Sequence, residues 1–342
     1  MESPLITFPL TTPWPTRDPF LFCVHHLDAF PTGNADLGPE ATLQGRNIGS
    51  DFSGIDGWSM YHGDTVPGFP QHPHRGFETV TFVVQGTLDH SDSLGATARF
   101  GPGDSQWLTA GAGIVHSEMM PLVKSDAPNP TELFQIWLNL ASEDKMADPH
   151  FSMTWDEHRP RVHHVDESGR ESIISLVAGN YEGELAPAPP PRSWASRPES
   201  GVVIWHVTMQ PGAIWTLPET AADVQRSLYL AHGNSISTPR GDIQPGEGTH
   251  LPDHHSLEIT ASEAGATLLI LGGTPINEPV AQYGPFVMNT RAELASTIEE
   301  YQRTQFGGWP WPTDDPNHGA TRDRFAVYPN GDAENPEASQ LV

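Results

Sequence analysis

Apolar and polar residues alternate along much of this chain, in short runs that end at glycine or proline. In residues 132–140 the even positions Phe134, Ile136, Leu138 and Leu140 are all apolar, and the odd positions are mixed. A period of two is typical of a strand with one mostly apolar side. Residues 20–24 are apolar without a break, which predicts a strand that is covered on both faces.

The same pattern predicts short strands in both halves of the chain. The predicted strands cover residues 58–62, 80–84, 106–109, 172–179, 201–209, 211–217, 227–233, 256–260 and 266–273. Turn residues separate them at even intervals, which favours a β-sandwich or β-barrel in each half. The composition, with 34 prolines and 32 glycines among 342 residues, is too rich in helix breakers for an all-helical protein.

One helix is predicted, late in the chain, at residues 290–301. It puts Leu294, Ile298 and Tyr301 on one stripe, and Thr290 begins a capping box with Glu293. From residue 307 onward the chain is acidic and proline-rich, and we expect an irregular tail that only the docking of its aromatic residues on the barrel would order. The predicted organisation is residues 1–145 as an N-terminal metal-binding domain, 146–306 as a C-terminal domain without metal, and 307–342 as the tail.

Two pairs of potential metal ligands mark residues 71–119. His72 and His74 form one pair, and His116 and Glu118 form the other. On a strand, side chains at i and i+2 point to the same face, roughly 6.6 Å apart, so two neighbouring strands could direct four donors at one ion. Three imidazoles and a carboxylate suit iron, manganese, nickel, copper or cobalt better than calcium or magnesium. Without a thiolate, a structural zinc site is not expected.

Two glutamates are candidates for the carboxylate ligand. Glu78 lies six residues after His72 and could take the place of Glu118. Arg75, Glu78 and His90 are also candidates to orient the ligands from behind.

The second half of the chain repeats the strand pattern of the first half but lacks such pairs. No histidine follows residues 215–217, where a pair would be expected. His250, His254 and His255 lie in a loop rich in proline and aspartate, without the i, i+2 spacing, so we expect a surface loop there.

The net charge of −26, from 43 acidic and 17 basic residues, excludes direct nucleic-acid binding, because such proteins need a basic surface. Cys23 is the single cysteine, so no intramolecular disulfide can form. No stretch has the roughly 18 apolar residues of a membrane span, and no signal peptide is evident at the start. A cytoplasmic protein that does not bind membranes is the expectation.

Three segments within residues 71–119 together resemble a known protein family. Residues 72–80, 102–111 and 116–119 closely resemble the pirin family of the cupin superfamily, and residues 18–20, 27–28 and 284–290 resemble it too. The resemblance implies an all-β bicupin: two antiparallel jelly-roll β-barrels with a few short helices, one near the C-terminus. It also implies that only the N-terminal barrel holds a metal, usually iron, on His72, His74, His116 and Glu118.

The resemblance implies a function as well. Several bacterial pirins are described as quercetin 2,3-dioxygenases, which open the central ring of a flavonol and release carbon monoxide. We therefore expect a metal-dependent dioxygenase for a small aromatic substrate, with Fe(2+) first and manganese, nickel, copper or cobalt as alternatives. Glu118 would be the catalytic base that accepts a proton from the substrate hydroxyl. The alternative is a non-catalytic iron-binding regulatory or sensor protein with a protein partner, as the animal relative is described.

Overall fold

The computed structural model describes residues 3–336 and groups them into two compact units, each described here by itself. The N-terminal cupin unit consists of His26–Gln135, Ser142–Asp156 and the chain from Glu278 onward. The C-terminal cupin unit consists of the chain up to His25, Ile136–Ala141 and Glu157–Asn277. Packing thus assigns residues 278–306, which the sequence places in the second domain, to the N-terminal cupin unit. The reason is long-range pairing, since Arg75 forms a bridge with Phe286.

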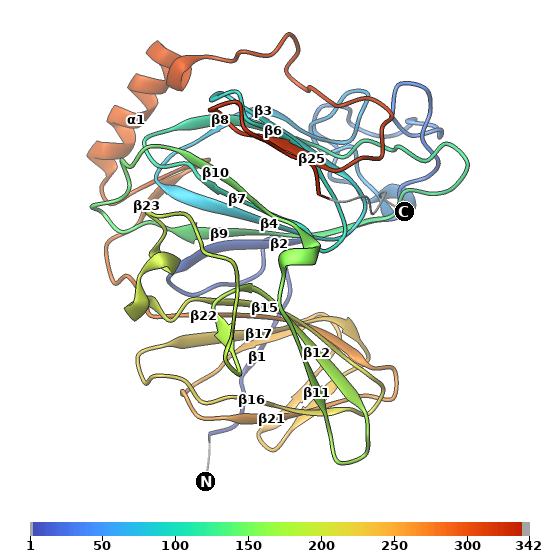
Figure 1. Ribbon diagram of the computed structural model, residues 1–342, viewed down its shortest axis with the longest axis vertical. Coiled ribbons are helices and arrows are strands. Elements are labelled where there is room, and N and C mark those ends of the chain that lie inside the picture. Colours follow the sequence, from blue (N-terminus) through green and yellow to red (C-terminus); the bar gives the residue numbers. More distant parts are fainter. Residues whose placement is uncertain (1–2, 337–342) are drawn as a thin grey trace. The chain divides into compact units, whose positions relative to one another are not determined.

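The N-terminal cupin unit is built of two antiparallel sheets (Figure 1). One sheet has the order β26-β25-β6-β5-β8-β3 and the other β10-β7-β4-β9-β2. The strands are β2 (Phe20–Asp28), β3 (Gly68–His74), β4 (Phe77–Gln85), β5 (Leu88–Asp92), β6 (Thr97–Phe100), β7 (Ser105–Thr109), β8 (Ile114–Met119), β9 (Thr131–Asn139), β10 (His150–Thr154), β25 (Phe325–Val327) and β26 (Ala333–Glu334). Strands β2 and β9 each run from one unit into the other.

The two sheets of this unit share one apolar core. Val83 and Leu108 come from one sheet, Leu88 and Ile114 from the other, and all four are buried in the same cluster. These are the inward positions of the alternating pattern, and each fully buried aliphatic side chain stabilises the fold by about 1.5–3 kcal/mol. The inner faces of the two sheets therefore pack against each other.

The C-terminal cupin unit repeats this plan. Its sheets have the orders β1-β20-β17-β22-β15-β12-β11 and β16-β21-β18-β19. The strands are β1 (Thr7–Pro9), β11 (Arg161–Val165), β12 (Glu171–Ala178), β15 (Val203–Met209), β16 (Ile214–Leu217), β17 (Gln225–Gly233), β18 (Ile236–Thr238), β19 (Gly241–Ile243), β20 (Glu247–His250), β21 (Leu257–Ala261) and β22 (Ala266–Gly273), with a hairpin of β13 (Asn180–Tyr181) and β14 (Glu184–Leu185). Its core is centred on Trp215, which is fully buried. The predicted all-β bicupin is confirmed.

The predicted C-terminal helix is confirmed. Helix α1 (Arg291–Thr304) begins at Thr290, whose side chain accepts the backbone N–H of Glu293 while the Glu293 side chain accepts that of Thr290. Leu294 packs with Phe286 and Met288 of the hairpin β23 (Ala281–Tyr283) and β24 (Phe286–Met288), so the apolar stripe is covered. Within the described residues, five short 3-10 segments complete the helical content: Ile55–Gly57, Asp156–His158, Trp194–Ser196, Pro198–Ser200 and Gln305–Gly307.

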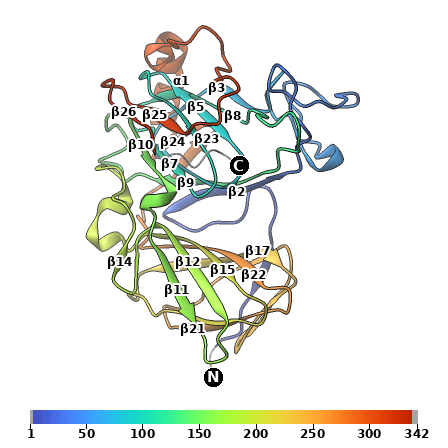
Figure 2. The same cartoon turned by 45° about the vertical axis from the view of Figure 1, so that its right-hand side comes forward.

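The prediction of an irregular tail is wrong for part of residues 307–336; residues 337–342 lie outside the described chain. Strand β25 pairs with β6 and β26 pairs with β25, so the tail extends the sheet that also contains β3 and β8. Figure 2 labels β25 and β26. The indole N–H of Trp311 also donates to the carbonyl of Asp92, at 2.8 Å. A short apolar run of three residues gave too little periodicity to reveal this edge strand.

The strand predicted at residues 58–62 is absent among the described residues, where only single bridges join Tyr61 to Asp51 and to Gly68. Side-chain bonds hold this segment in place of a ladder. Asp28 is buried and accepts the Ser59 backbone N–H at 3.0 Å and the Tyr61 hydroxyl at 2.7 Å.

Asp28 gives the fold a pH dependence. Burial raises the pKa of its carboxyl from 3.8 to about 6, against the bonds from Tyr61 and Ser59. The neutral form therefore favours folding: its contribution is complete below pH 3.8 and is lost as the pH rises through about 6. A shift of this size corresponds to about 3 kcal/mol in the free energy of unfolding. Urea titrations at pH 4 and pH 8 should show this decline in the wild type and a smaller decline in Asp28→Asn; equal declines would contradict it.

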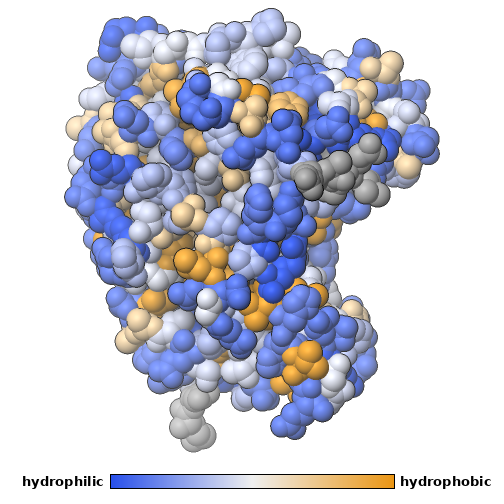
Figure 3. All heavy atoms as spheres, viewed as in Figure 1, coloured by the Kyte–Doolittle hydropathy of each residue, from blue (hydrophilic) through white to orange (hydrophobic). Residues whose placement is uncertain are grey.

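The surface is mostly hydrophilic, with isolated apolar side chains, on the face seen in Figure 3. Ile6, Leu185 and Tyr283 are the most exposed large apolar residues in the described chain. Within residues 3–336, none of the helices combines the length and the apolarity that a membrane crossing requires.

Candidate metal centre

The two predicted ligand pairs lie on adjacent strands of one sheet. Strand β3 carries His72 and His74, β8 carries His116 and Glu118, and His72 is the direct cross-strand neighbour of His116. The register of β3 shifts between Phe69 and His72, and such a bulge changes the direction of the side chains that follow. All four side chains fall at inward positions by strand parity.

Three of the four ligand candidates meet at one point. One ring nitrogen each of His72, His74 and His116 lie within 4.8 Å of one another. Imidazole nitrogens bond such ions at about 2.0–2.1 Å, so nitrogens on one ion are at most about 4.2 Å apart. Small side-chain rotations would bring these three onto a shared ion.

The chemical state of the histidines suits metal binding. Nδ1 of His72 lies 2.9 Å from the carbonyl of Pro70, and because a carbonyl can only accept, the proton is on Nδ1 and Nε2 keeps its lone pair. Burial lowers the pKa of His72 to about 4 and the pKa values of His74 and His116 well below their usual range. The three rings are therefore neutral at pH 7.

The ring nitrogens of His116 indicate that these residues fit a metal ion. His116 is fully buried, and within the described chain neither of its ring nitrogens has a hydrogen-bond partner. A buried polar group without a partner costs about 1–3 kcal/mol and needs an explanation. A cation shared with His72 and His74 supplies one, so the residues fit.

The turn after His74 is held rigidly. Arg75 is buried and donates from Nε to the carbonyl of Ala112 at 2.6 Å. Lys145 Nζ donates to the carbonyl of Gly76 at 2.8 Å. Gly76 has φ = 84°, and a Cβ there would lie 1.9 Å from the carbonyl oxygen of Val287, so only glycine fits. The direction in which β3 presents its histidines is thus fixed from outside the strand.

Glu118 is close to the triad but is held to one side. Its Oε2 lies 3.9 Å from Nε2 of His116, and no carboxylate belongs to the mutually close triad within the described residues. Oε1 accepts the Thr81 hydroxyl at 3.0 Å, and Oε2 accepts the Gln135 amide at 3.1 Å. Burial raises the pKa of Glu118, although these two hydrogen bonds oppose the rise. Glu118 would have to turn from Thr81 and Gln135 to become a ligand.

Sequence reasoning missed Thr81 and Gln135. Their signal was present: Gln135 is a polar residue among apolar neighbours on β9, and Thr81 is at an inward position of β4. Polarity at an inward position requires a polar partner, which here is Glu118.

The alternative ligand Glu78 points elsewhere. Strand β3 ends at His74 and a new strand begins at Phe77, so strand parity does not carry over the turn from His72. Glu78 and Thr81 are three positions apart on β4, so their side chains point to opposite faces of the strand. Thr81 points inward, and Glu78 therefore points away from the triad. Its Oε1 accepts the hydroxyl of Thr109 at 2.6 Å.

His90 lies beside the triad on β5. Its ring is 5.5 Å from that of His116, and its Nε2 is 3.2 Å from the Asp92 carboxylate. On the other side it stacks on Phe151, 5.0 Å away and nearly parallel. Because the carboxylate of Asp92 accepts the Nε2 proton, the orientation of this ring is fixed next to the triad.

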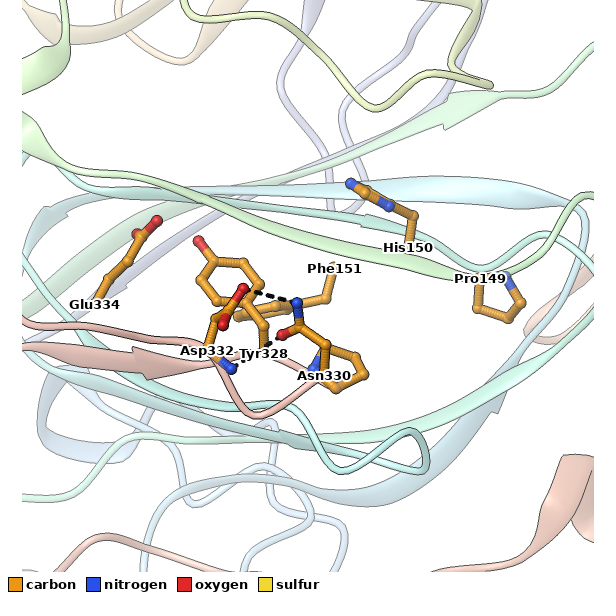
Figure 4. A pocket seen from close by; sticks show the side chains of 8 residues that line it. Pro149, His150, Phe151, Tyr328, Asn330, Asp332 and Glu334 are labelled. Carbon is orange, nitrogen blue, oxygen red and sulfur yellow. Dashed lines mark hydrogen bonds between the residues drawn. The ribbon is translucent and has the colours of Figure 1, made fainter.

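A pocket with a volume of about 480 Å³ lies beyond Phe151, between β10 and the tail (Figure 4). Phe151 and Tyr328 lie against each other there, with ring centroids 5.5 Å apart. Asn330 and Asp332 bond each other within the tail turn, at 2.7 Å and 3.0 Å. None of the triad lines this pocket, so it is separate from the candidate metal centre.

Comparisons with known proteins show the family. The family description "Pirin" matches residues 40–138, and "Pirin C-terminal cupin domain" matches residues 204–307. A Pseudomonas aeruginosa protein whose name proposes a quercetin 2,3-dioxygenase is 36% identical over 244 residues, which cover 70% of this chain and 79% of that protein. A Solanum lycopersicum pirin-like protein is 34% identical over 246 residues, covering 69% and 75%.

Among solved structures, quercetin 2,3-dioxygenase from Acinetobacter baumannii superposes with a TM-score of 0.70. It is 24% identical and covers 90% of this chain and 99% of its own. At this identity the likeness supports the fold alone.

Proposed function

This chain belongs to the pirin family, and from that premise we propose that it is a metal-dependent dioxygenase that opens a flavonol or another chelating phenol. The name of the Pseudomonas protein suggests the reaction class. The observation that carries the proposal is the neutral triad of His72, His74 and His116, the last two of them buried, which lies next to a carboxylate that is not fixed within it.

The proposed ligands are His72, His74 and His116, with Glu118 as a fourth. Three imidazoles and at most one carboxylate leave positions open on a six-coordinate ion, and iron(II) is the ion we propose, with manganese, nickel, copper and cobalt as alternatives. When bound, such an ion would hold the adjacent hydroxyl and keto oxygens of the substrate and lower the pKa of the hydroxyl.

In this proposal the side chains of the protein transfer a proton and position the base and the substrate. Glu118 accepts the proton of the substrate hydroxyl, and its raised pKa makes it a stronger base than an exposed carboxylate. Thr81 and Gln135 hold it within reach of the triad. Phe77, whose ring is 5.0 Å from that of His74, offers an apolar contact for a flat aromatic ring.

The test is oxygen uptake with quercetin by protein loaded anaerobically with ferrous iron. We expect one carbon monoxide released for each dioxygen consumed, and loss of both in Glu118→Gln. Iron binding without uptake, across a panel of chelating phenols, would contradict the dioxygenase. It would favour the non-catalytic iron-binding sensor with a protein partner.

In this proposal Gln135 limits how readily the Glu118 carboxylate can bind the metal ion. Its amide competes with the ion for the carboxylate, so Gln135→Leu should strengthen metal binding by about tenfold, the value of one net hydrogen bond of roughly 1.4 kcal/mol. The matched control is Gln106→Leu, because Gln106 is buried opposite Thr81 and its amide has no partner within the described chain. Equilibrium dialysis with cobalt(II) would measure both variants. Weaker binding in Gln135→Leu would show instead that Gln135 orients Glu118 for ligation.

A further inference from the structure

A second group of metal-ligating atoms lies in the C-terminal cupin unit. One oxygen of Glu219 and one ring nitrogen each of His254 and His255 lie within 4.8 Å of one another. Glu219 follows the end of β16, and the two histidines lie in the loop between β20 and β21. His250, which the sequence grouped with them, is separate: its Nδ1 lies 2.7 Å from the Ser227 hydroxyl.

The loops that carry these residues are tied to each other. The backbone N–H of Thr220 donates to the carbonyl of His254 at 3.0 Å. Beneath them, the buried guanidinium of Arg226 donates to the carbonyls of Pro218 at 2.5 Å and of His255 at 2.7 Å. The terminal nitrogens of one buried side chain thus tie both segments together, so the backbone positions of the three ligands are set before any ion binds.

The side chains themselves are free to adjust. Glu219 and His255 are exposed and His254 is half-buried. Ligand atoms around a tetrahedral ion with bonds near 2.0–2.1 Å are about 3.4 Å apart, so a closure of roughly 1.4 Å or less is required. Rotation of exposed side chains covers such a distance within nanoseconds. The rigid loops and mobile side chains together make the geometry attainable.

We propose that Glu219, His254 and His255 form a second cation site, for a late first-row divalent ion such as zinc. Two imidazoles and a carboxylate suit zinc, copper or nickel and not magnesium or calcium, which prefer oxygen ligands. Water completes the coordination, because the site is exposed. The excess of negative charge over the whole chain favours the approach of cations. The structure confirms the surface loop expected for these histidines, and the proposal adds a cation site to it.

The experiment uses the full chain with His116→Ala as the background, so that the candidate metal centre does not contribute. Zinc binding is measured by isothermal titration in excess magnesium, which occupies scattered carboxylates without competing for imidazoles. We expect one zinc per chain, and a loss of affinity of at least about tenfold in His254→Ala/His255→Ala and in Glu219→Gln.

The matched control is His163→Ala/His164→Ala. These residues are also adjacent histidines, but on strand β11 they point to opposite faces and form no shared site. Zinc binding should be unchanged in this control. No zinc uptake in the His116→Ala background, or uptake that persists in the triple variant lacking Glu219, His254 and His255, would overturn the proposal. Neither result would bear on the metal centre proposed for the other unit.

Discussion

Replacement of His116 by alanine is expected to reduce iron(II) affinity by at least about 100-fold and to abolish oxygen uptake. Mutating a residue that only hydrogen-bonds to a metal ligand already lowers metal affinity by about 10- to 100-fold, and loss of a ligand should lower it further. His116 is the member of the triad on β8: its ring lies 4.5 Å from that of His72 and 4.9 Å from that of His74, both on β3. Anaerobic titration with ferrous iron would measure the affinity.

The stability of the metal-free protein separates this loss from misfolding. Because the side chain of His116 forms no hydrogen bond within the described chain, its truncation breaks none, and the thermal unfolding midpoint without metal should change little. With iron present, the wild type should gain stability and His116→Ala should not, since a ligand that binds only the folded state stabilises it. His150→Ala, an exposed histidine on β10, is the control and should bind iron as the wild type does. Unchanged iron affinity in His116→Ala would contradict the proposed ligand set.

Replacement of Asp89 by alanine is expected to lower the free energy of unfolding by about 3–5 kcal/mol, the effect of leaving a buried charge without its partner. Asp89 on β5 and Arg99 on β6 are directly opposite, fully buried and joined by two bonds of 2.6 Å. The same network holds the tail, because Arg99 donates to the carbonyl of Gly319 at 2.8 Å and Asp89 accepts the backbone N–H of His318 at 2.9 Å. Urea denaturation would measure the loss.

The chain offers a matched pair as the control for Asp89. His163 and Glu171 are 2.7 Å apart but exposed, so Glu171→Ala should change stability by about 1 kcal/mol or less. The double variant Asp89→Leu/Arg99→Met should recover much of the loss, because it leaves no buried charge, although the bonds to the tail stay broken. If Asp89→Ala and Glu171→Ala cost the same, the buried network would not be the link between the sheet and the tail.

Local periodicity was sufficient to predict much of the fold. The alternation in residues 132–140 and the capping box at Thr290 each depend on a few neighbouring residues, and β9 and α1 formed as expected. The histidine pairs were equally local, because spacing by two fixes a common face on any strand. Strand β25 could not be predicted in the same way, because its pairing with β6 joins residues more than 200 positions apart.

The position of Glu118 shows the limit of reasoning from spacing. Parity correctly puts it on the same face as His116, but its distance from the triad depends on Thr81 and Gln135, which come from other strands. The meeting of Glu219 with His254 and His255 is similar, since it depends on Arg226 holding two loops together. Hydrogen bonds between distant segments leave no periodic trace in the sequence.

The most direct test of the metal centre is anomalous diffraction at the iron edge from crystals of the full chain grown with ferrous iron. The account predicts a single strong iron peak within bonding distance, about 2.0–2.3 Å, of one ring nitrogen each of His72, His74 and His116. An iron peak bound to other residues, or none above the noise in iron-loaded crystals, would contradict it.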